Sequence, residues 1–291
     1  MDAFMQFLQT TFAPLVLVFT VSNLGTMGLQ VRVPEVTAAM RNGKSMVLIF
    51  VWGWLLGPAL GILITKVLPL AEPYVIVVLL ASLAPCAPFL QQMVTKARGD
   101  MGFAGAFIPL VVLGTVVLMP LMAPILIKGL TISAWALARP LLFTILVPLL
   151  IGAAVRHFAG DAATRVFPAA KMIAQLSTLA TVVWCLVLYG PSMLDTAGSF
   201  ALLSMTLFMV IMGLITFLVG FGMQPAQKSV MSLGMGTRNI AAVLAAALAI
   251  PDGDTRIVVM VVMWTLWSVV LAAVGARIIA RKVPLAPATT T

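Results

Sequence analysis

The sequence has 291 residues, of which 62% are hydrophobic and 9% charged, and its mean hydropathy is +1.16. Soluble domains carry about 45–50% apolar and about 25% charged residues, so this composition excludes a soluble protein. The net charge of +9 fits the basic loops of a membrane protein better than a nucleic-acid-binding surface. The two cysteines lie in apolar segments and indicate neither a disulfide framework nor a metal cluster. We therefore expect a lipid bilayer as partner, and no nucleic acid, metal or cofactor.

The apolar runs, taken in chain order, predict an all-α polytopic membrane protein with nine transmembrane helices. A spanning helix needs about 20 apolar residues, and the continuous runs exclude the alternating pattern of a membrane β-barrel. The first run lacks the basic start and cleavage site of a signal peptide, so we expect it to be a retained helix. The predicted spans are residues 10–29, 45–66, 73–97, 101–127, 135–156, 166–189, 199–221, 226–250 and 255–280, followed by a disordered tail at 283–291.

The basic residues of the loops predict the orientation of the chain. With the N-terminus outside, twelve Lys and Arg residues fall on one side of the membrane and four on the other. Cytoplasmic loops carry the excess of Lys and Arg. We therefore expect a multi-pass protein of the bacterial inner (plasma) membrane, with the N-terminus outside and the C-terminus in the cytoplasm.

The third span is interrupted by two prolines, Pro85 and Pro88. Each proline removes a backbone donor and clashes with the carbonyl four residues earlier, so the helix is expected to break there. The freed carbonyls are tolerated at membrane depth only where they face protein or a water-filled cavity. Gln91 and Gln92 follow at once, and we expect their amides to bind substrate beside the break.

The eighth span is predicted to break at Gly234 and Gly236, immediately before Thr237, Arg238 and Asn239. An arginine near the bilayer centre is costly, by about 2.5–3.5 kcal/mol on insertion scales. No carboxylate lies within a predicted span, so backbone carbonyls, water or a bound anion must compensate the charge. All three polar residues are candidate substrate ligands. The alternatives are an arginine that snorkels to an interface, or one that locks the crossing through the carbonyls freed by the prolines.

The two interrupted spans lie five spans apart, so they run in opposite directions through the bilayer. This arrangement predicts an inverted repeat, in which spans one to four match spans six to nine and the two broken helices cross at the binding site. Asn23 in the first span and Thr178 in the sixth lie at similar depth in matching units, and both are candidate pocket residues.

At these residues the sequence resembles the bile acid:sodium symporter family over nearly its whole length. The matching segments are Met27-Gly28-Leu29, the proline break followed by Ala97-Arg98-Gly99-Asp100, Pro148 and Gly152 of the fifth span, and the break from Gly236 to Asn239. The resemblance implies a panel part made of spans 1, 5 and 6, and a core part made of spans 2, 3, 4, 7, 8 and 9. It also implies a secondary transporter that works by alternating access, through an elevator-like or rocking motion.

Several positions depart from the family pattern for sodium binding. The resemblance places a glutamate at Gly234 and a glutamine at Arg238, and only Asn239 is kept. The other implied sodium ligands fall on Leu90, Gln91, Ala104 and Ile108. Sodium is a hard cation that needs several oxygen ligands. We therefore expect no sodium coupling, Arg238 in place of the cation, and a small organic anion as substrate, moved by uniport, by exchange or in response to membrane potential.

Two other functions remain alternatives. An arsenite efflux permease would use the thiol of Cys86, which follows Ala84-Pro85, but the acidic residue that such permeases carry in the second broken helix is missing. A non-transporting membrane sensor could descend from a transporter that lost its ion sites. An enzyme is not expected, because the sequence holds neither an HExxH motif nor a Ser-His pair inside the membrane.

Overall fold

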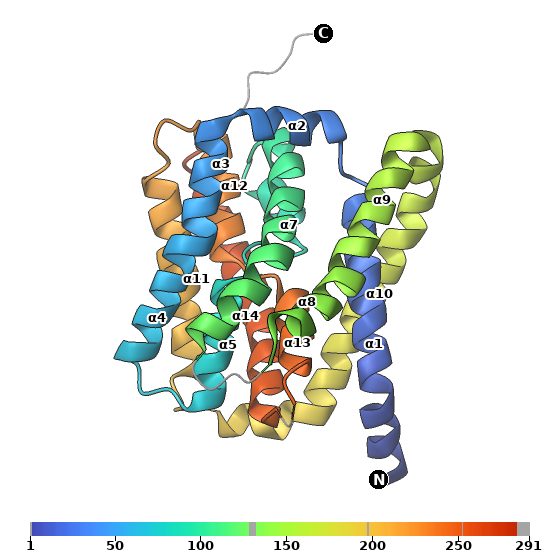
Figure 1. The fold of residues 1–291 in the computed structure, drawn as a ribbon, viewed down its shortest axis with the longest axis vertical. Coiled ribbons are helices and arrows are strands. Elements are labelled where there is room, and N and C mark those ends of the chain that lie inside the picture. The colour runs from blue at the N-terminus through green and yellow to red at the C-terminus, as the bar shows by residue number, and fades with distance from the viewer. Residues whose placement is uncertain (1, 128–131, 197, 252, 284–291) are drawn as a thin grey trace.

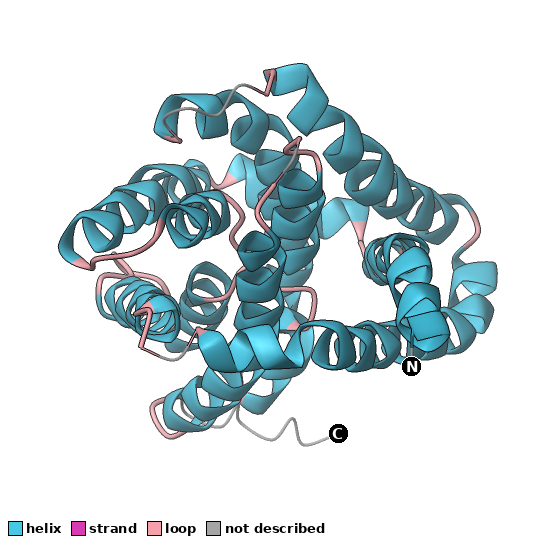
Figure 2. Cartoon of the chain, turned by 90° about the horizontal axis from the view of Figure 1, so that it is seen from below, coloured by secondary structure: helices cyan, strands magenta, loops and turns pink. Residues whose placement is uncertain are grey.

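The computed structural model describes residues 2–127, 132–196, 198–251 and 253–283, and these residues are all helix, turn or loop apart from one isolated β-bridge. Figure 2 shows this bundle of helices from below. Apart from Val283, the tail predicted to be disordered lies outside the described residues. The described residues therefore form an all-helical fold, as the sequence predicted.

Among the described residues, seven helices are long and apolar enough to cross a membrane. They correspond to seven of the nine predicted spans. They are α1 (Asp2–Gly28), α3–η1–α4 (Gly43–Phe50, Val51–Leu56, Gly57–Val67), α7 (Met101–Leu126), α8–η2–α9 (Ala134–Leu141, Leu142–Leu146, Val147–Phe158), α10 (Gly160–Asp195), α11 (Ala201–Leu218) and α14 (Thr255–Ala280). The segments η1 and η2 are single turns of π-helix inside otherwise continuous helices.

The other two predicted spans are pairs of shorter helices. The third span consists of α5 (Glu72–Ser82) and α6 (Leu90–Lys96), and the eighth consists of α12 (Pro225–Gly236) and α13 (Ile240–Leu248). Both α5 and α12 begin with a proline in the first turn, where a missing N–H costs nothing. The nine-span count and the inverted repeat stay predictions.

One group of helices consists of α1, α9 and α10, which pack against one another at one side of the molecule (Figure 1). Two glycines let the backbones of α1 and α9 touch. A Cβ added to Gly28 would lie 2.2 Å from the Leu149 carbonyl oxygen, and one added to Gly152 would lie 2.3 Å from the Gly25 carbonyl oxygen. Small residues are the usual means of close helix approach in membranes, where no hydrophobic force drives helices together.

The remaining helices pack around the two interrupted pairs, with α11 and α14 both against α12 and with α14 also against α5, α6 and α13. A short helix that the sequence did not predict, α2 (Val33–Arg41), lies across one end of the bundle and packs on α7 (Figure 1). It joins α1 to α3, and its amphipathic sequence suits an interfacial position.

Candidate functional site

The two interrupted helix pairs, α5–α6 and α12–α13, contact each other at the non-helical segments that interrupt them. Pro85 and Arg238 form an antiparallel bridge, in which the Asn239 N–H donates to the Ala84 carbonyl at 2.7 Å. The Cys86 N–H donates to the carbonyls of Gly234 at 2.9 Å and Thr237 at 3.0 Å. Backbone groups that the breaks release from helices therefore satisfy one another, as burial requires.

The side chains on either side of Arg238 complete this pairing. Thr237 Oγ1 accepts from the Ala87 N–H at 3.1 Å and donates to the Leu233 carbonyl at 2.7 Å. Asn239 is the N-cap of α13, where its Oδ1 accepts from the Ala242 N–H at 3.2 Å. Both side chains are buried. The bond from Ala87 to Thr237 joins the two breaks, whereas the Asn239 bond caps α13 within its own span.

Arg238 lies inside the crossing with an exposed fraction of 0%. Its guanidinium donates to the carbonyls of Ala81 at 3.3 Å and Ser82 at 3.4 Å, and also to the Met235 carbonyl. The Phe208 ring lies under the guanidinium carbon, with its centroid 4.6 Å away, which adds a cation–π contact.

The surroundings of Arg238 are those of a cation site. Ala81 and Ser82 end α5, while Met235 lies one residue from the end of α12, so the guanidinium sits at the C-terminal ends of two helices. Each helix C-terminus carries about half a negative charge, because its last carbonyls have no partner within the helix. Two such ends together match one positive charge.

The break of the eighth span follows directly after its two glycines. Helix α12 continues through Gly234 and ends at Gly236, and the extended residue Thr237 follows. The two glycines also allow close packing: a Cβ at Gly234 would lie 2.3 Å from Phe107 Cε1, and one at Gly236 would lie 3.1 Å from the Met209 carbonyl oxygen. In the third span, Pro85 and Pro88 do lie within the break between Ser82 and Leu90.

A polar cavity of about 230 Å³ lies between α1 and α10 on one side and α6 on the other. Its lining consists of Asn23, Thr26, Met27, Gln30, Pro88, Gln91, Gln92, Thr95, Met101, Phe167, Lys171, Ala174 and Gln175. Amides dominate the polar part of this lining. Lys171 is the only charged residue among the described lining residues, so the cavity offers hydrogen-bond donors and one positive charge.

The cavity brings together three of the predicted substrate ligands, Asn23, Gln91 and Gln92. Thr178 contacts Asn23, whose Nδ2 donates to Thr178 Oγ1 at 3.1 Å, but it lines a smaller neighbouring cavity. Thr237, Arg238 and Asn239 do not line the polar cavity, and the predicted contact of these three with a substrate stays a prediction.

Lys171 is not among the substrate ligands predicted from the sequence. There it counts only as one of the twelve basic residues on the cytoplasmic side. The structure starts α10 at Gly160, so Lys171 lies eleven residues into the helix. Gln175 follows four residues later and therefore faces the same side of the helix. A lysine and an amide four residues apart within a predicted span are the sequence feature that could have identified Lys171 as a candidate substrate ligand.

Within the described residues, no group of three or more His, Cys, Asp or Glu side chains could hold a metal ion.

Seven membrane-length helices, together with two interrupted pairs joined at their breaks, define a multi-pass membrane protein of the kind found among secondary transporters. The chain belongs to the sodium bile acid symporter family, whose model matches residues 14–196, more than half of its length. No curated protein matches the chain closely enough to count as a relative. The family is one of transporters, consistent with a protein that is not an enzyme.

Proposed function

We propose that this protein is a secondary transporter of the bacterial inner membrane that moves a small organic anion by alternating access without sodium. The observation that carries this proposal is the position of Arg238 between the C-terminal ends of α5 and α12. A fixed guanidinium there supplies the positive charge that a bound cation supplies elsewhere in the family.

The proposed topology has nine crossings, with the N-terminus outside and the C-terminus in the cytoplasm. Seven continuous helices and two interrupted pairs support this count. The packing of α1 against α9 and α10 supports a panel part made of α1, α8–η2–α9 and α10, with the other spans as a core. The antiparallel meeting of the two breaks supports an inverted repeat.

The packing around the lost sodium ligands supports sodium independence. The position at which the family resemblance places a carboxylate is Gly234, and the Phe107 ring fills the space that its side chain would need. Three other positions carry the apolar and fully or almost fully buried side chains of Leu90, Ala104 and Ile108. Few oxygen ligands are left to coordinate a hard cation.

The polar cavity supports an anionic substrate. Lys171 provides the charge, and the amides of Asn23, Gln91, Gln92 and Gln175 can donate to a carboxylate or sulfate. The cavity lies between the proposed panel and the proposed core, so a relative movement of the two would open it to alternate sides. The thiol of Cys86, which arsenite efflux would need, is fully buried and does not line this cavity.

Transport is expected to proceed equally well with sodium, potassium or choline as the only external cation. The measurement is uptake of labelled organic anions into proteoliposomes preloaded with the same anion. Liposomes that hold an Arg238→Ala variant provide the background rate. Uptake that requires sodium would contradict the proposal, and binding without any flux would favour a sensor.

Replacement of Lys171 by glutamine is expected to weaken substrate binding about tenfold. A charged hydrogen bond contributes roughly 1.5–3 kcal/mol, and 1.4 kcal/mol corresponds to a factor of ten. The effect should appear as a higher KM for transport. It should also appear as a higher anion concentration at which the shift of the thermal unfolding midpoint reaches half of its maximum value. Lys96→Gln is the matched control, because Lys96 is exposed and lies outside the cavity lining. Equal affinities of the two variants would remove Lys171 from the binding site.

A further inference from the structure

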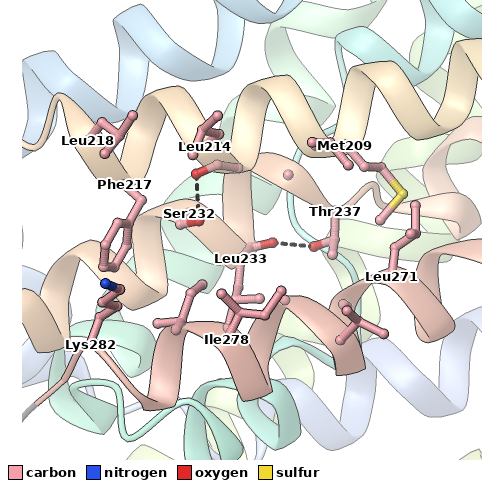
Figure 3. A pocket seen from close by; sticks show the side chains of 17 residues that line it. Met209, Leu214, Phe217, Leu218, Ser232, Leu233, Thr237, Leu271, Ile278 and Lys282 are labelled. Atoms are coloured by element: carbon pink, nitrogen blue, oxygen red, sulfur yellow. Dashed lines mark hydrogen bonds between the residues drawn. The ribbon is translucent and has the colours of Figure 1, made fainter.

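A second and larger cavity of about 370 Å³ forms a groove between α11 and α14, with α12 as its floor (Figure 3). The groove lies apart from the polar cavity, and the two share no lining residue. Its lining is almost entirely aliphatic or aromatic, and consists of Met209, Val210, Gly213, Leu214, Phe217, Leu218, Ser232, Leu233, Gly236, Thr237, Leu271, Ala272, Val274, Gly275, Ile278, Ile279 and Lys282.

The groove exists because its walls carry small residues. A Cβ added to Gly275 would meet no atom closer than Leu233 Cδ2 at 3.9 Å. The two hydroxyls of the lining are already used within the protein, since Ser232 Oγ donates to the Gly213 carbonyl at 2.6 Å and Thr237 Oγ1 donates to the Leu233 carbonyl at 2.7 Å. The walls therefore offer an occupant little besides hydrocarbon.

The length of the groove matches one leaflet of a bilayer. From Leu271 in α14 to Lys282, two residues beyond the end of α14 at Ala280, the lining extends over eleven residue steps, or about 16 Å at 1.5 Å per residue. The hydrocarbon core is about 30 Å thick, so the groove covers about half of it. Figure 3 shows Lys282 at one end of the groove, beside Phe217, and Leu271 and Thr237 at the other.

The Lys282 end of the groove is positively charged. Lys282 is exposed, and its neighbour Arg281 is exposed as well. Two more lysines lie near the adjoining turn after α11: Lys228 packs over Gly220, and Lys44 Nζ lies 3.0 Å from where a Cβ of Gly222 would be. No acidic residue belongs to the described groove lining.

We propose that this groove binds one acyl chain of an anionic phospholipid, whose phosphate pairs with Lys282. The length of the groove and its apolar walls fit a phospholipid acyl chain, and the basic rim favours an anionic headgroup over a zwitterionic one. The inner end of the groove includes Thr237, the residue before Arg238, so a bound chain also covers the end of α12 at the crossing. Lipid composition would thereby affect the stability of the crossing, independently of what the transporter carries.

The test compares dioleoyl phosphatidylglycerol with dioleoyl phosphatidylcholine, each added to the detergent-purified protein. Native mass spectrometry counts retained lipids, and thermal unfolding reports stabilisation. The wild type is expected to retain one phosphatidylglycerol molecule in preference to phosphatidylcholine. Lys282→Gln is expected to reduce that preference about fivefold, which is the effect of the roughly 1 kcal/mol that one lysine contributes beside an anionic lipid surface. Gly275→Leu is expected to abolish retention of either lipid, because its side chain fills the groove.

Two control variants separate this site from general effects. Arg281→Gln removes an equal charge from the rim but outside the lining and should lower the preference clearly less than Lys282→Gln, and Gly190→Leu adds the same side chain on α10, where nothing lies within 4 Å. Equal retention of both lipids by the wild type, or an equal effect of Lys282→Gln and Arg281→Gln, would overturn the proposal. A dimer that Gly275→Leu converts to a monomer would overturn it as well, by assigning the groove to a second copy of the chain.

Discussion

Arg238→Ala is expected to abolish transport and to lower the free energy of unfolding by roughly 3–5 kcal/mol. The substitution leaves the carbonyls of Ala81, Ser82 and Met235 buried without a donor and removes the cation–π contact with Phe208. It also leaves the C-terminal ends of α5 and α12 facing each other with no charge between them. The measurements are anion flux in proteoliposomes and thermal or denaturant unfolding in detergent.

Two further variants separate the charge of Arg238 from its volume. Arg238→Met keeps a long side chain without the charge and should be nearly as inactive as alanine, whereas Arg238→Lys should keep part of the activity. Methylguanidinium should recover part of the stability that Arg238→Ala loses. Arg256→Ala is the control, because Arg256 is exposed and, among the described residues, forms its ion pair with Asp254, whose carboxyl pKa its hydrogen bonds lower. An active and stable Arg238→Met protein would contradict the role of Arg238 as a built-in cation.

Gly152→Val is expected to destabilise the protein by about 3 kcal/mol or more, at the upper end of the effects of overpacking. Any Cβ at this position meets backbone, 2.3 Å from the Gly25 carbonyl oxygen and 2.8 Å from the Leu29 nitrogen. Backbone cannot rotate away as a side chain can, so α1 and α9 must separate. The measurement is the thermal unfolding midpoint, together with the fraction of monodisperse protein after size exclusion.

Gly190→Val is the matched control for this substitution. Gly190 lies in α10, within the same group of helices, but a Cβ there meets nothing within 4 Å. The control variant should therefore stay folded. If both variants unfold at the same temperature, the loss reflects β-branching in a helix and not the contact between α1 and α9.

The helical segments could be predicted from the sequence because a spanning helix needs a long apolar run and little else. Seven such runs became continuous helices, five of them within three residues of their predicted bounds, while α1 begins eight residues earlier than predicted. Helix α2 was not predicted because it is short and amphipathic, and its apolar face is settled by contact with α7. Helix α10 is longer than the predicted span 166–189 and covers Gly160–Asp195, because a helix can continue beyond the apolar region.

The candidate site was predictable only in part. The break at Pro85 and Pro88 could be predicted because proline lacks an N–H. This property belongs to the residue itself and does not depend on its surroundings. Helix α12 ends at Gly236, yet the sequence did not indicate that Gly234 and Gly236 also serve close packing, because only the approach of Phe107 and the Met209 backbone reveals this second use. Lys171 faces Gln91 and Gln92 across a cavity through packing between distant helices, which no local pattern encodes.

The glycine contact between α1 and α9 has a consequence for biosynthesis. Gly28 and Gly152 are 152 − 28 = 124 residues apart, and chains grow at about 5–20 residues per second, so α1 waits roughly 6–25 seconds for its partner. During that interval α3 to α7 emerge, and α1 makes few lasting contacts with them. Helix α1 therefore docks only after α3 to α7 have been made. Any substitution that weakens this docking would expose an unpaired helix to quality-control proteases before the protein has ever functioned.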